Sequence, residues 1–333
     1  MRTHLAQTKI TIAGAGIAGL WQAYVLAKAG HRVRLIEQSA TPFEVSASRW
    51  AGAMIAPDCE AESAPAIVRD LGRTSLALWQ TAYPGVIVNG TLVVAAPRDR
   101  ADLTRFQRVT EAHQLLHATR LADLEPRLAE RFDAALYFPR EAHMDAMAAL
   151  NALLVALRGF GVDVQMGAPY AAGDEDILID CRGMAARNDI ADLRGVRGER
   201  IIVRAKDVML QRPVRLLHPR QPIYVVPQGD GRFVIGATVI EREDAGAVTV
   251  RSALELLGSA FALDPGFAEA EIVDIGAGVR PAFADNTPRI LIEGDGKIIR
   301  VNGMYRHGFL LAPVMAEGVA AFLRDGSRHP LMA

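Results

Sequence analysis

A glycine-rich turn between an expected strand and an expected helix constrains this chain most strongly. Residues 9–13 are apolar and rich in β-branched side chains, and the glycine motif GAGIAG starts directly after them at Gly14. Residues 17–29 then suit a helix, and residues 32–37 form a second apolar strand pattern. Strand, helix and strand in this order make a βαβ unit, which places both strands in one parallel sheet.

Each part of this turn has a physical role at a dinucleotide. Gly14 permits the tight turn, Gly16 lets the backbone approach a pyrophosphate, and Gly19 lets the helix pack on the strand. The helix N-terminus presents free N–H groups and a positive dipole to the phosphates. Glu37 ends the second strand, eighteen residues after Gly19. Its carboxylate suits an adenosine ribose and disfavours the 2′-phosphate of NADP, so the fingerprint alone leaves NAD and FAD open.

The rest of the chain mixes helices with antiparallel hairpins. Residues 222–237 and 288–303 each hold an Asp-Gly turn between strand-like segments, which predicts two hairpins. Helices are expected over residues 101–116, 145–160 and 312–323, and strands over residues 91–96, 162–166 and 177–180. Because βαβ-type pieces lie at the start, middle and end, with antiparallel pieces between them, we expect two interleaved domains.

Four longer segments carry more specific patterns. They are ASRWAGAMIAP (47–57), RPVRLLHPRQPIYVVPQGDGRFVIGATVIE (212–241), GVRPAFADNTPRI (278–290) and NGMYRHGFLLAPVMAEGVAAFL (302–323). Together they resemble the D-amino-acid-oxidase-like family of FAD-dependent oxidoreductases, and within it the glycine oxidases of thiamine biosynthesis. The resemblance runs over about residues 8–325. Its most specific part is the Arg-Pro segment combined with the terminal Tyr-Arg segment.

The resemblance implies an α/β plus α+β fold. A Rossmann-like FAD-binding domain of the glutathione-reductase type, as in D-amino acid oxidase, would be interleaved with an antiparallel-sheet substrate domain. The FAD-binding domain would comprise residues 1–75, 141–195 and 276–333, and the substrate-binding domain residues 76–140 and 196–275. The FAD would be bound non-covalently, because no cysteine follows Cys181 to carry the flavin linkage of the sarcosine oxidase relatives.

The resemblance also implies which residues act on a substrate. Oxidation of an amino acid at Cα by flavin needs an anchor for the carboxylate, and the planar fork of arginine suits that role. Arg280 matches the family's carboxylate anchor, Arg306 matches an arginine near the substrate, and Tyr224 matches a tyrosine that lines the pocket. The residues expected to bind FAD are Gly14, Gly16, Ile17, Ala18, Gly19, Glu37, Gln38, Ser48, Arg49, Gly52, Ala53, Met54, Gly183, Met304, Tyr305, His307, Gly308, Phe309, Leu310 and Leu311.

The last loop and helix depart from the family pattern. Backbone N–H groups over residues 308–311 would stabilise the negative charge of reduced flavin. Relatives often have histidine where Met304 stands and asparagine where His307 stands. We expect the contacts at the flavin edge to differ from those of the family at these two positions. His307 has two interpretations, as a group that tunes the flavin or, more commonly for a loop histidine, as part of the polar surface.

We therefore expect an enzyme that oxidises glycine or another small amino acid or amine by hydride transfer from Cα to flavin N5. Reoxidation by O₂ would give H₂O₂, and the imine would hydrolyse to glyoxylate and ammonia or enter the thiazole of thiamine. Alternatives of the same family are oxidases or dehydrogenases of a D-amino acid, sarcosine or another amine. A different class is a non-catalytic FAD-binding protein, which would not need Arg280, Arg306 and Tyr224 together.

The amino-acid composition limits the kinds of partner and compartment that the protein is expected to have. The 333 residues hold 37 Lys and Arg against 38 Asp and Glu, so no basic surplus favours nucleic acid. Two cysteines, Cys59 and Cys181, cannot make a disulfide framework, which favours a reducing compartment. The apolar run over residues 10–27 approaches a membrane span in length, but its glycines and its change of period argue against a span or a signal peptide. We expect a cytoplasmic protein with a small amine substrate and O₂ as partners, and leave homo-oligomerisation open.

His113 and His117 are four residues apart, a spacing that on a helix suits a metal. No third ligand accompanies them in the sequence. We therefore expect these two histidines to lie on a surface helix without a metal.

Overall fold

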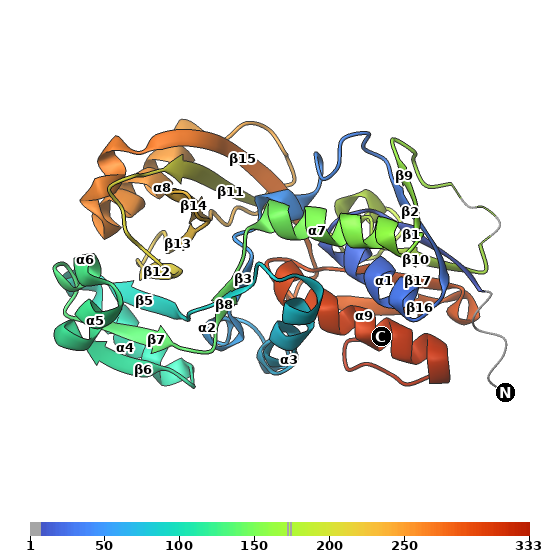
Figure 1. Ribbon diagram of the computed structural model, residues 1–333, viewed down its shortest axis with the longest axis horizontal. Coiled ribbons are helices and arrows are strands. Elements are labelled where there is room, and N and C mark those ends of the chain that lie inside the picture. Colours follow the sequence, from blue (N-terminus) through green and yellow to red (C-terminus); the bar gives the residue numbers. More distant parts are fainter. Residues whose placement is uncertain (1–7, 172, 174) are drawn as a thin grey trace.

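The fold is built on two large β-sheets. The computed structural model describes residues 8–171, 173 and 175–333. The sheets lie at opposite ends of the molecule, and a small third sheet lies between them (Figure 1). The chain passes between the two large sheets several times. Segments that are far apart in the sequence therefore meet in the region between them.

The six-stranded sheet has the strand order β16-β17-β10-β1-β2-β9. Its strands are β1 (Lys9–Ala13), β2 (Arg32–Glu37), β9 (Asp163–Met166), β10 (Ile177–Asp180), β16 (Arg289–Glu293) and β17 (Ile298–Asn302). All pair in parallel except β16, which is antiparallel to β17. The inner strand β1 is buried along most of its length, which agrees with the continuous apolar pattern of a strand covered on both faces.

Helices from distant parts of the chain cover this sheet. They are α1 (Ile17–Lys28), α7 (Ala146–Gly159) and α9 (Gly308–Asp325), and α3 (Ala66–Ala82) lies against α9. Helix α1 packs against α7 and α9, and α3 packs against α9 (Figure 1). The predicted N-cap of α7 is confirmed, because the side chain of Asp145 accepts a hydrogen bond from the backbone N–H of Ala148 at 2.9 Å.

The eight-stranded sheet has the order β15-β11-β14-β13-β12-β5-β7-β6. Its strands are β5 (Thr91–Ala95), β6 (Gln114–His117), β7 (Ala134–Phe138), β11 (Arg194–Arg204), β12 (Val214–Leu217), β13 (Ile223–Pro227), β14 (Arg232–Gly236) and β15 (Glu271–Ala282). Pairing is antiparallel except between β12 and β5. The helices on this sheet are α4 (Arg100–Val109), α5 (Ala118–Leu124), α6 (Pro126–Ala129) and α8 (Val250–Leu263).

The third sheet links the two large ones. It has the order β3-β8-β4, with β3 (Met54–Ile55), β4 (Ile87–Val88) and β8 (Ala142–His143). The short helix α2 (Pro57–Glu60) follows β3. This arrangement brings α2 beside both the start of α9 and strand β12, as the ion pairs of Glu60 described below demonstrate.

Both predicted hairpins are confirmed, as β13 with β14 and β16 with β17. In each, an aspartate between two glycines, Asp230 or Asp295, adopts a positive φ of the kind that tight hairpin turns require. The strands predicted at Arg32–Glu37 and Ile177–Asp180 have the predicted bounds.

The helix predicted over residues 101–116 is wrong in its second half. Helix α4 ends at Val109, the Thr110 hydroxyl donates to the Phe106 carbonyl, and Ala112 has a φ of 60°. Residues 114–117 then form β6, which pairs with β7 far along the chain. His113 and His117 therefore do not share a helix face, and no cluster of His, Cys, Asp and Glu suited to a metal occurs among the described residues.

The C-terminal helix begins earlier than predicted. The sequence predicts its start at about Ala312, whereas α9 starts at Gly308 and holds Pro313 inside it. A search of the described residues for a membrane-crossing helix finds none of sufficient length and apolarity.

Candidate functional site

The glycine turn between β1 and α1 is tightly closed. Gly14 has a φ of 97°, a conformation that glycine adopts without strain. At Gly19 an added Cβ would lie 1.8 Å from the Gly14 carbonyl oxygen, so the first turn of α1 packs directly on the loop. The turn thus leaves no room for side chains at these two positions. Its backbone faces a cavity that Gly14 and Gly16 both line.

Two side chains from neighbouring segments hold this loop in place. Glu37, buried at the end of β2, accepts hydrogen bonds from the backbone N–H of Ala15 at 2.8 Å and of Ser39 at 3.0 Å. Ser48 accepts a hydrogen bond from the backbone N–H of Ile17 at 3.0 Å. Glu37 and Ser48 also line the cavity, so they both support the glycine turn and form part of the cavity wall.

The cavity has a volume of about 600 Å³ and lies between the two large sheets. Most residues singled out in the sequence meet around it. Those that line it are Gly14, Gly16, Ile17, Ala18, Glu37, Gln38, Ser48, Gly52, Ala53, Met54, Gly183, Tyr224, Arg280, Met304, Tyr305, Arg306, Gly308, Phe309 and Leu310. A volume of this size is typical of a site that encloses much of a small organic ligand.

Four expected residues lie just outside this lining. Gly19 packs against the loop, and Leu311 is fully buried in the core. Arg49 is partly exposed and lies 3.6 Å from the carboxylate of Asp274. His307 is only 1% exposed, so its interpretation as part of the polar surface is wrong.

The start of α9 lies at the cavity wall. Gly308, Phe309 and Leu310 line the cavity, and the side chain of the N-cap residue His307 makes no capping hydrogen bond. The Phe309 carbonyl lacks its helical partner, because residue 313 is a proline without an N–H. The indole Nε1 of Trp79 in α3 donates to that carbonyl at 2.7 Å, and its ring stacks on Phe309. Helix α3 therefore completes the first turn of α9.

Arg280 enters the cavity from β15, at the edge of the eight-stranded sheet. Its guanidinium passes over Gly198 of β11, where an added Cβ would lie 2.0 Å from Nη2. Nη1 donates to the Thr238 carbonyl at 3.2 Å. Among the described residues no carboxylate pairs with Arg280, and burial lowers the pKa of its guanidinium. The arrangement leaves a cavity-facing cation without a carboxylate in contact with it in the described part of the chain.

Tyr224 stands beside Arg280 on the same cavity wall. Its ring lies between two glycines, because an added Cβ would approach the ring to 2.7 Å from Gly52 and to 2.6 Å from Gly236. Strand β12 pairs next to it, with Arg215 directly opposite Tyr224 in the register. The ring is therefore held from both sides, with its hydroxyl near Arg280.

Arg306 differs from Arg280, because it has a carboxylate partner. Its Nε lies 2.8 Å from the Glu60 carboxylate, and its Nη2 hydrogen-bonds the Ser63 hydroxyl. The other Glu60 oxygen accepts from Arg215 at 2.6 Å. Burial disfavours a charged Glu60, but the two arginines outweigh it and hold the pKa of this carboxyl far below its usual range. Sequence reasoning singled out neither Glu60, which lies outside the four quoted segments, nor Arg215, which lies within the segment 212–241 but 155 residues from Glu60.

His307 lies against this cluster at the start of α9. Its Nδ1 is 3.4 Å from a Glu60 oxygen, yet burial dominates and lowers the pKa of the imidazole to about 4. His307 is therefore neutral at pH 7.

Comparison with known proteins identifies the family. The sequence model of the family of FAD-dependent oxidoreductases matches residues 9–322 of this chain. The chain belongs to this family. It is 48% identical to a protein of Rhizobium etli named as a thiamine biosynthesis oxidoreductase, ThiO, over 97% of this chain and 98% of that protein.

More distant relatives of this chain are also oxidases. A glycine oxidase of Geobacillus kaustophilus is 27% identical over 93% of this chain and 91% of that protein. The solved glycine oxidase structure of the same organism has a TM-score of 0.80 at 24% identity, covering 98% of this chain and 96% of that chain. This confirms the predicted fold class and makes FAD the cofactor.

The residues present fit FAD. A pyrophosphate needs close backbone approach and N–H groups at a helix start. The glycine turn and the start of α1 provide both, with the N–H groups of Ala15 and Ile17 already taken by Glu37 and Ser48. A flavin ring needs a cavity with a partial positive charge at its edge, which the start of α9 provides. Cys181 is buried and lies at the dinucleotide end of the cavity, beside Gly14 and Gly19.

Replacing Trp79 with Phe should lower the free energy of unfolding by about 1–3 kcal/mol, because the Phe309 carbonyl loses its donor. Trp21→Phe is a matched control, since the Trp21 indole N–H is buried without a hydrogen-bond partner in the described structure. Urea unfolding measures both variants. Equal losses of stability in the two would contradict the role given to the Trp79 hydrogen bond.

His307 also predicts a pH dependence of stability. A histidine whose folded pKa is about 4, below its usual 6.5, contributes stability that is present above pH 6.5 and lost as pH falls toward 4. Each pKa unit of difference corresponds to roughly 1.4 kcal/mol. His307→Gln should therefore reduce the loss of stability between pH 6.5 and 4, measured by urea unfolding. If the stability of His307→Gln depended on pH in the same way as that of the wild type, this role of His307 would be contradicted.

Proposed function

We propose that the protein oxidises glycine, or a closely related small amino acid or amine, to its imine, and that it does so in thiamine biosynthesis. The observation that carries this proposal is Arg280, a cavity-facing guanidinium without an acidic partner among the described residues. Such a group suits the carboxylate of a small amino acid. The names of the relatives, ThiO and glycine oxidase, support the substrate and the pathway.

Arg280 would hold the substrate carboxylate through its guanidinium fork, which fixes the position of Cα. Tyr224 would donate its hydroxyl to the same carboxylate, because the ring is held beside Arg280. The positive charge of Arg280 would favour the neutral form of the substrate amine, which is the form that can release a hydride. These residues bind and orient the substrate, and none of them needs to act as a nucleophile.

Arg306 has a different role from Arg280 in this proposal. Its pairing with Glu60 leaves it less available for a second carboxylate. The pair closes the cavity with a polar wall, which disfavours a large apolar side chain on the substrate. A small amino acid such as glycine needs no apolar surface there.

FAD would be held by the glycine turn and the start of α1 at its phosphates, by Glu37 at its ribose, and around the ring by the cavity-lining residues of the segments 48–54 and 304–310. When bound, FAD supplies the acceptor for the hydride from Cα, and O₂ takes up the two electrons as H₂O₂ while the imine hydrolyses to glyoxylate and ammonia. The N–H groups at the start of α9 would stabilise negative charge at the ring edge.

We also propose the predicted division of the chain. Residues 1–75, 141–195 and 276–333 would form the FAD-binding domain, and residues 76–140 and 196–275 the substrate-binding domain. The strands of the six-stranded sheet all fall within the first set. The cytoplasmic location stays a prediction from the sequence.

The function is tested by mixing the purified holoprotein with glycine under anaerobic conditions and following the absorbance of oxidised flavin. The proposal expects bleaching, and return of colour with H₂O₂ formation when air is admitted. The rates of flavin bleaching by glycine, sarcosine and D-alanine at equal concentration show which amine is the preferred substrate. A flavin that none of these amines bleaches would overturn the proposal, and colour that returns only with a quinone would assign a dehydrogenase.

Arg280→Ala should raise the KM for glycine strongly while FAD remains bound. Loss of a buried charge pair costs roughly 2–4 kcal/mol of binding, or about 30- to 1000-fold in affinity. Arg120→Ala, at an exposed arginine of α5, is the control. Steady-state kinetics and flavin content measure both variants, and an unchanged KM in Arg280→Ala would refute the anchor.

A further inference from the structure

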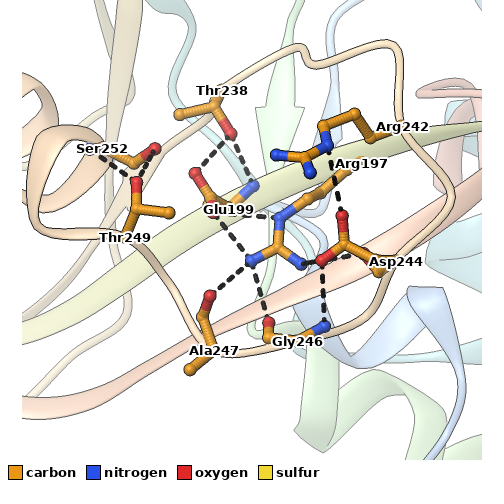
Figure 2. Close-up of polar contacts among 9 residues, drawn as sticks. All are labelled: Arg197, Glu199, Thr238, Arg242, Asp244, Gly246, Ala247, Thr249 and Ser252. Atoms are coloured by element: carbon orange, nitrogen blue, oxygen red, sulfur yellow. Dashed lines mark hydrogen bonds and ion pairs between the residues drawn. The ribbon is translucent and has the colours of Figure 1, made fainter.

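A buried polar network lies behind the strand that supports Arg280 (Figure 2). Arg197 and Glu199 belong to β11, and their side chains are only 3% and 0% exposed. Side chains alternate along a strand, so these two share one face while Gly198 between them faces the Arg280 guanidinium. The cavity-facing side of β11 therefore supports the proposed anchor, and the opposite side holds an ion pair outside the cavity.

Arg197 uses every nitrogen of its guanidinium in this network. Nε and Nη2 donate to Glu199 at 3.0 and 2.8 Å. Nη2 also donates to the carbonyls of Gly246 and Ala247, and Nη1 donates to the carbonyl and carboxylate of Asp244. Figure 2 shows these bonds converging on one guanidinium. Arg197 thus fixes the loop that follows β14 and leads to α8.

Thr238 connects the ion pair to Arg280. Its hydroxyl donates to Glu199 Oε2 at 3.1 Å and accepts from the Glu199 backbone N–H at 2.9 Å. Its own backbone N–H donates to the Glu199 carbonyl at 3.2 Å. The remaining polar group of Thr238, its carbonyl, accepts from Nη1 of Arg280 at 3.2 Å. A continuous set of hydrogen bonds therefore runs from Arg197 through Glu199 and Thr238 to Arg280.

The charge of Glu199 fixes the direction of these bonds. Burial disfavours the carboxylate, but donors from Ser252, Arg197 and Thr238 outweigh it and lower the pKa of Glu199 below its usual value. A carboxylate only accepts hydrogen bonds, so the Thr238 hydroxyl must donate to it. The lone pair of that hydroxyl is then left for the Glu199 N–H, which leaves Thr238 one orientation.

Arg280 needs such support, because little else in the described structure holds it. The Thr238 carbonyl is the single hydrogen-bond acceptor that the protein offers its guanidinium within the described residues. A long side chain that must present its fork in one geometry loses affinity when it is free to move. The position of the Thr238 carbonyl thus selects the arginine conformation.

We propose that Glu199 and Thr238 are positioning residues for Arg280, and that Arg197 holds them in place from outside the cavity. They would set the affinity for a carboxylate without touching substrate or cofactor. This inference rests on the proposed function, because it takes Arg280 as the anchor of the substrate carboxylate. It goes further by assigning a role to a network that lines no part of the cavity.

The test compares Thr238→Val, which keeps the shape and removes the hydroxyl, with Thr238→Ser, which keeps the hydroxyl. Thr110→Val is the matched control, because that buried threonine donates to the Phe106 carbonyl in α4, far from β11 along the sheet. Each holoprotein is titrated with acetate, followed by the change in flavin absorbance. KM and kcat for glycine, FAD affinity and urea stability are measured in parallel.

We expect Thr238→Val to weaken acetate binding and raise the KM for glycine together, by five- to twentyfold, with kcat changed less than threefold and FAD affinity unchanged. Thr238→Ser should stay within threefold of the wild type, and Thr110→Val should lose stability without changing acetate affinity. Wild-type acetate affinity in Thr238→Val would overturn the inference. So would a parallel loss of FAD, kcat and stability, since that marks a structural role alone.

If Thr238→Val does not yield soluble holoprotein, Glu199→Gln replaces it, with the same shift expected in acetate affinity. Failure of the proposed function is distinguishable, because the acetate titration needs no turnover. A wild-type protein that glycine does not reduce, but whose acetate affinity depends on Thr238, would reject the substrate and keep the positioning network. A wild type that binds no acetate would overturn the network's role.

Discussion

The site depends on a partly buried arginine, Arg280, for which the described structure supplies no counter-charge. Burial of an unpaired cation is unfavourable, and proteins usually offset it with a carboxylate. Arg280 has one carbonyl acceptor at 3.2 Å and no acidic partner in the described structure. The strand β15 and the glycine beneath the side chain still force the guanidinium into the cavity. The missing counter-charge is what a carboxylate ligand would bring.

The second arginine of the cavity makes the contrast clear. Arg306 is the same residue type and lines the same cavity, yet Glu60 neutralises it and Arg215 completes the cluster. The two arginines therefore differ in what they can offer a ligand, although a sequence presents them as equals. Arg280 is therefore proposed as the substrate anchor and Arg306 as part of the cavity wall, because only Arg306 has a carboxylate partner in the described structure.

The sequence predicted the elements whose cause is local. The glycine turn, the strand that ends at Glu37 and both Asp-Gly hairpins depend on residues within a few positions of each other, and the structure confirms them. It failed at residues 110–117, where pairing of β6 with β7 decides the conformation over a helical pattern. It also favoured the surface for His307, because a loop composition does not reveal that α2 and α9 enclose it.

The site was predictable only in part. Motif resemblance supplied Arg280, Arg306 and Tyr224, and the structure brings all three to one cavity. Their roles stay predictions. Of the partners that distinguish them, Glu60 lies outside the quoted segments, and Thr238 lies within the segment 212–241, where nothing local marks its contact with Arg280. Only the folded chain reveals both partners.

The most direct measurement is a crystal structure of the FAD-bound protein with acetate. The account predicts both acetate oxygens on the guanidinium of Arg280, with the Tyr224 hydroxyl in contact and Arg306 still paired with Glu60. Acetate held by Arg306 or Arg215, with Arg280 turned away or paired to a protein carboxylate, would contradict it.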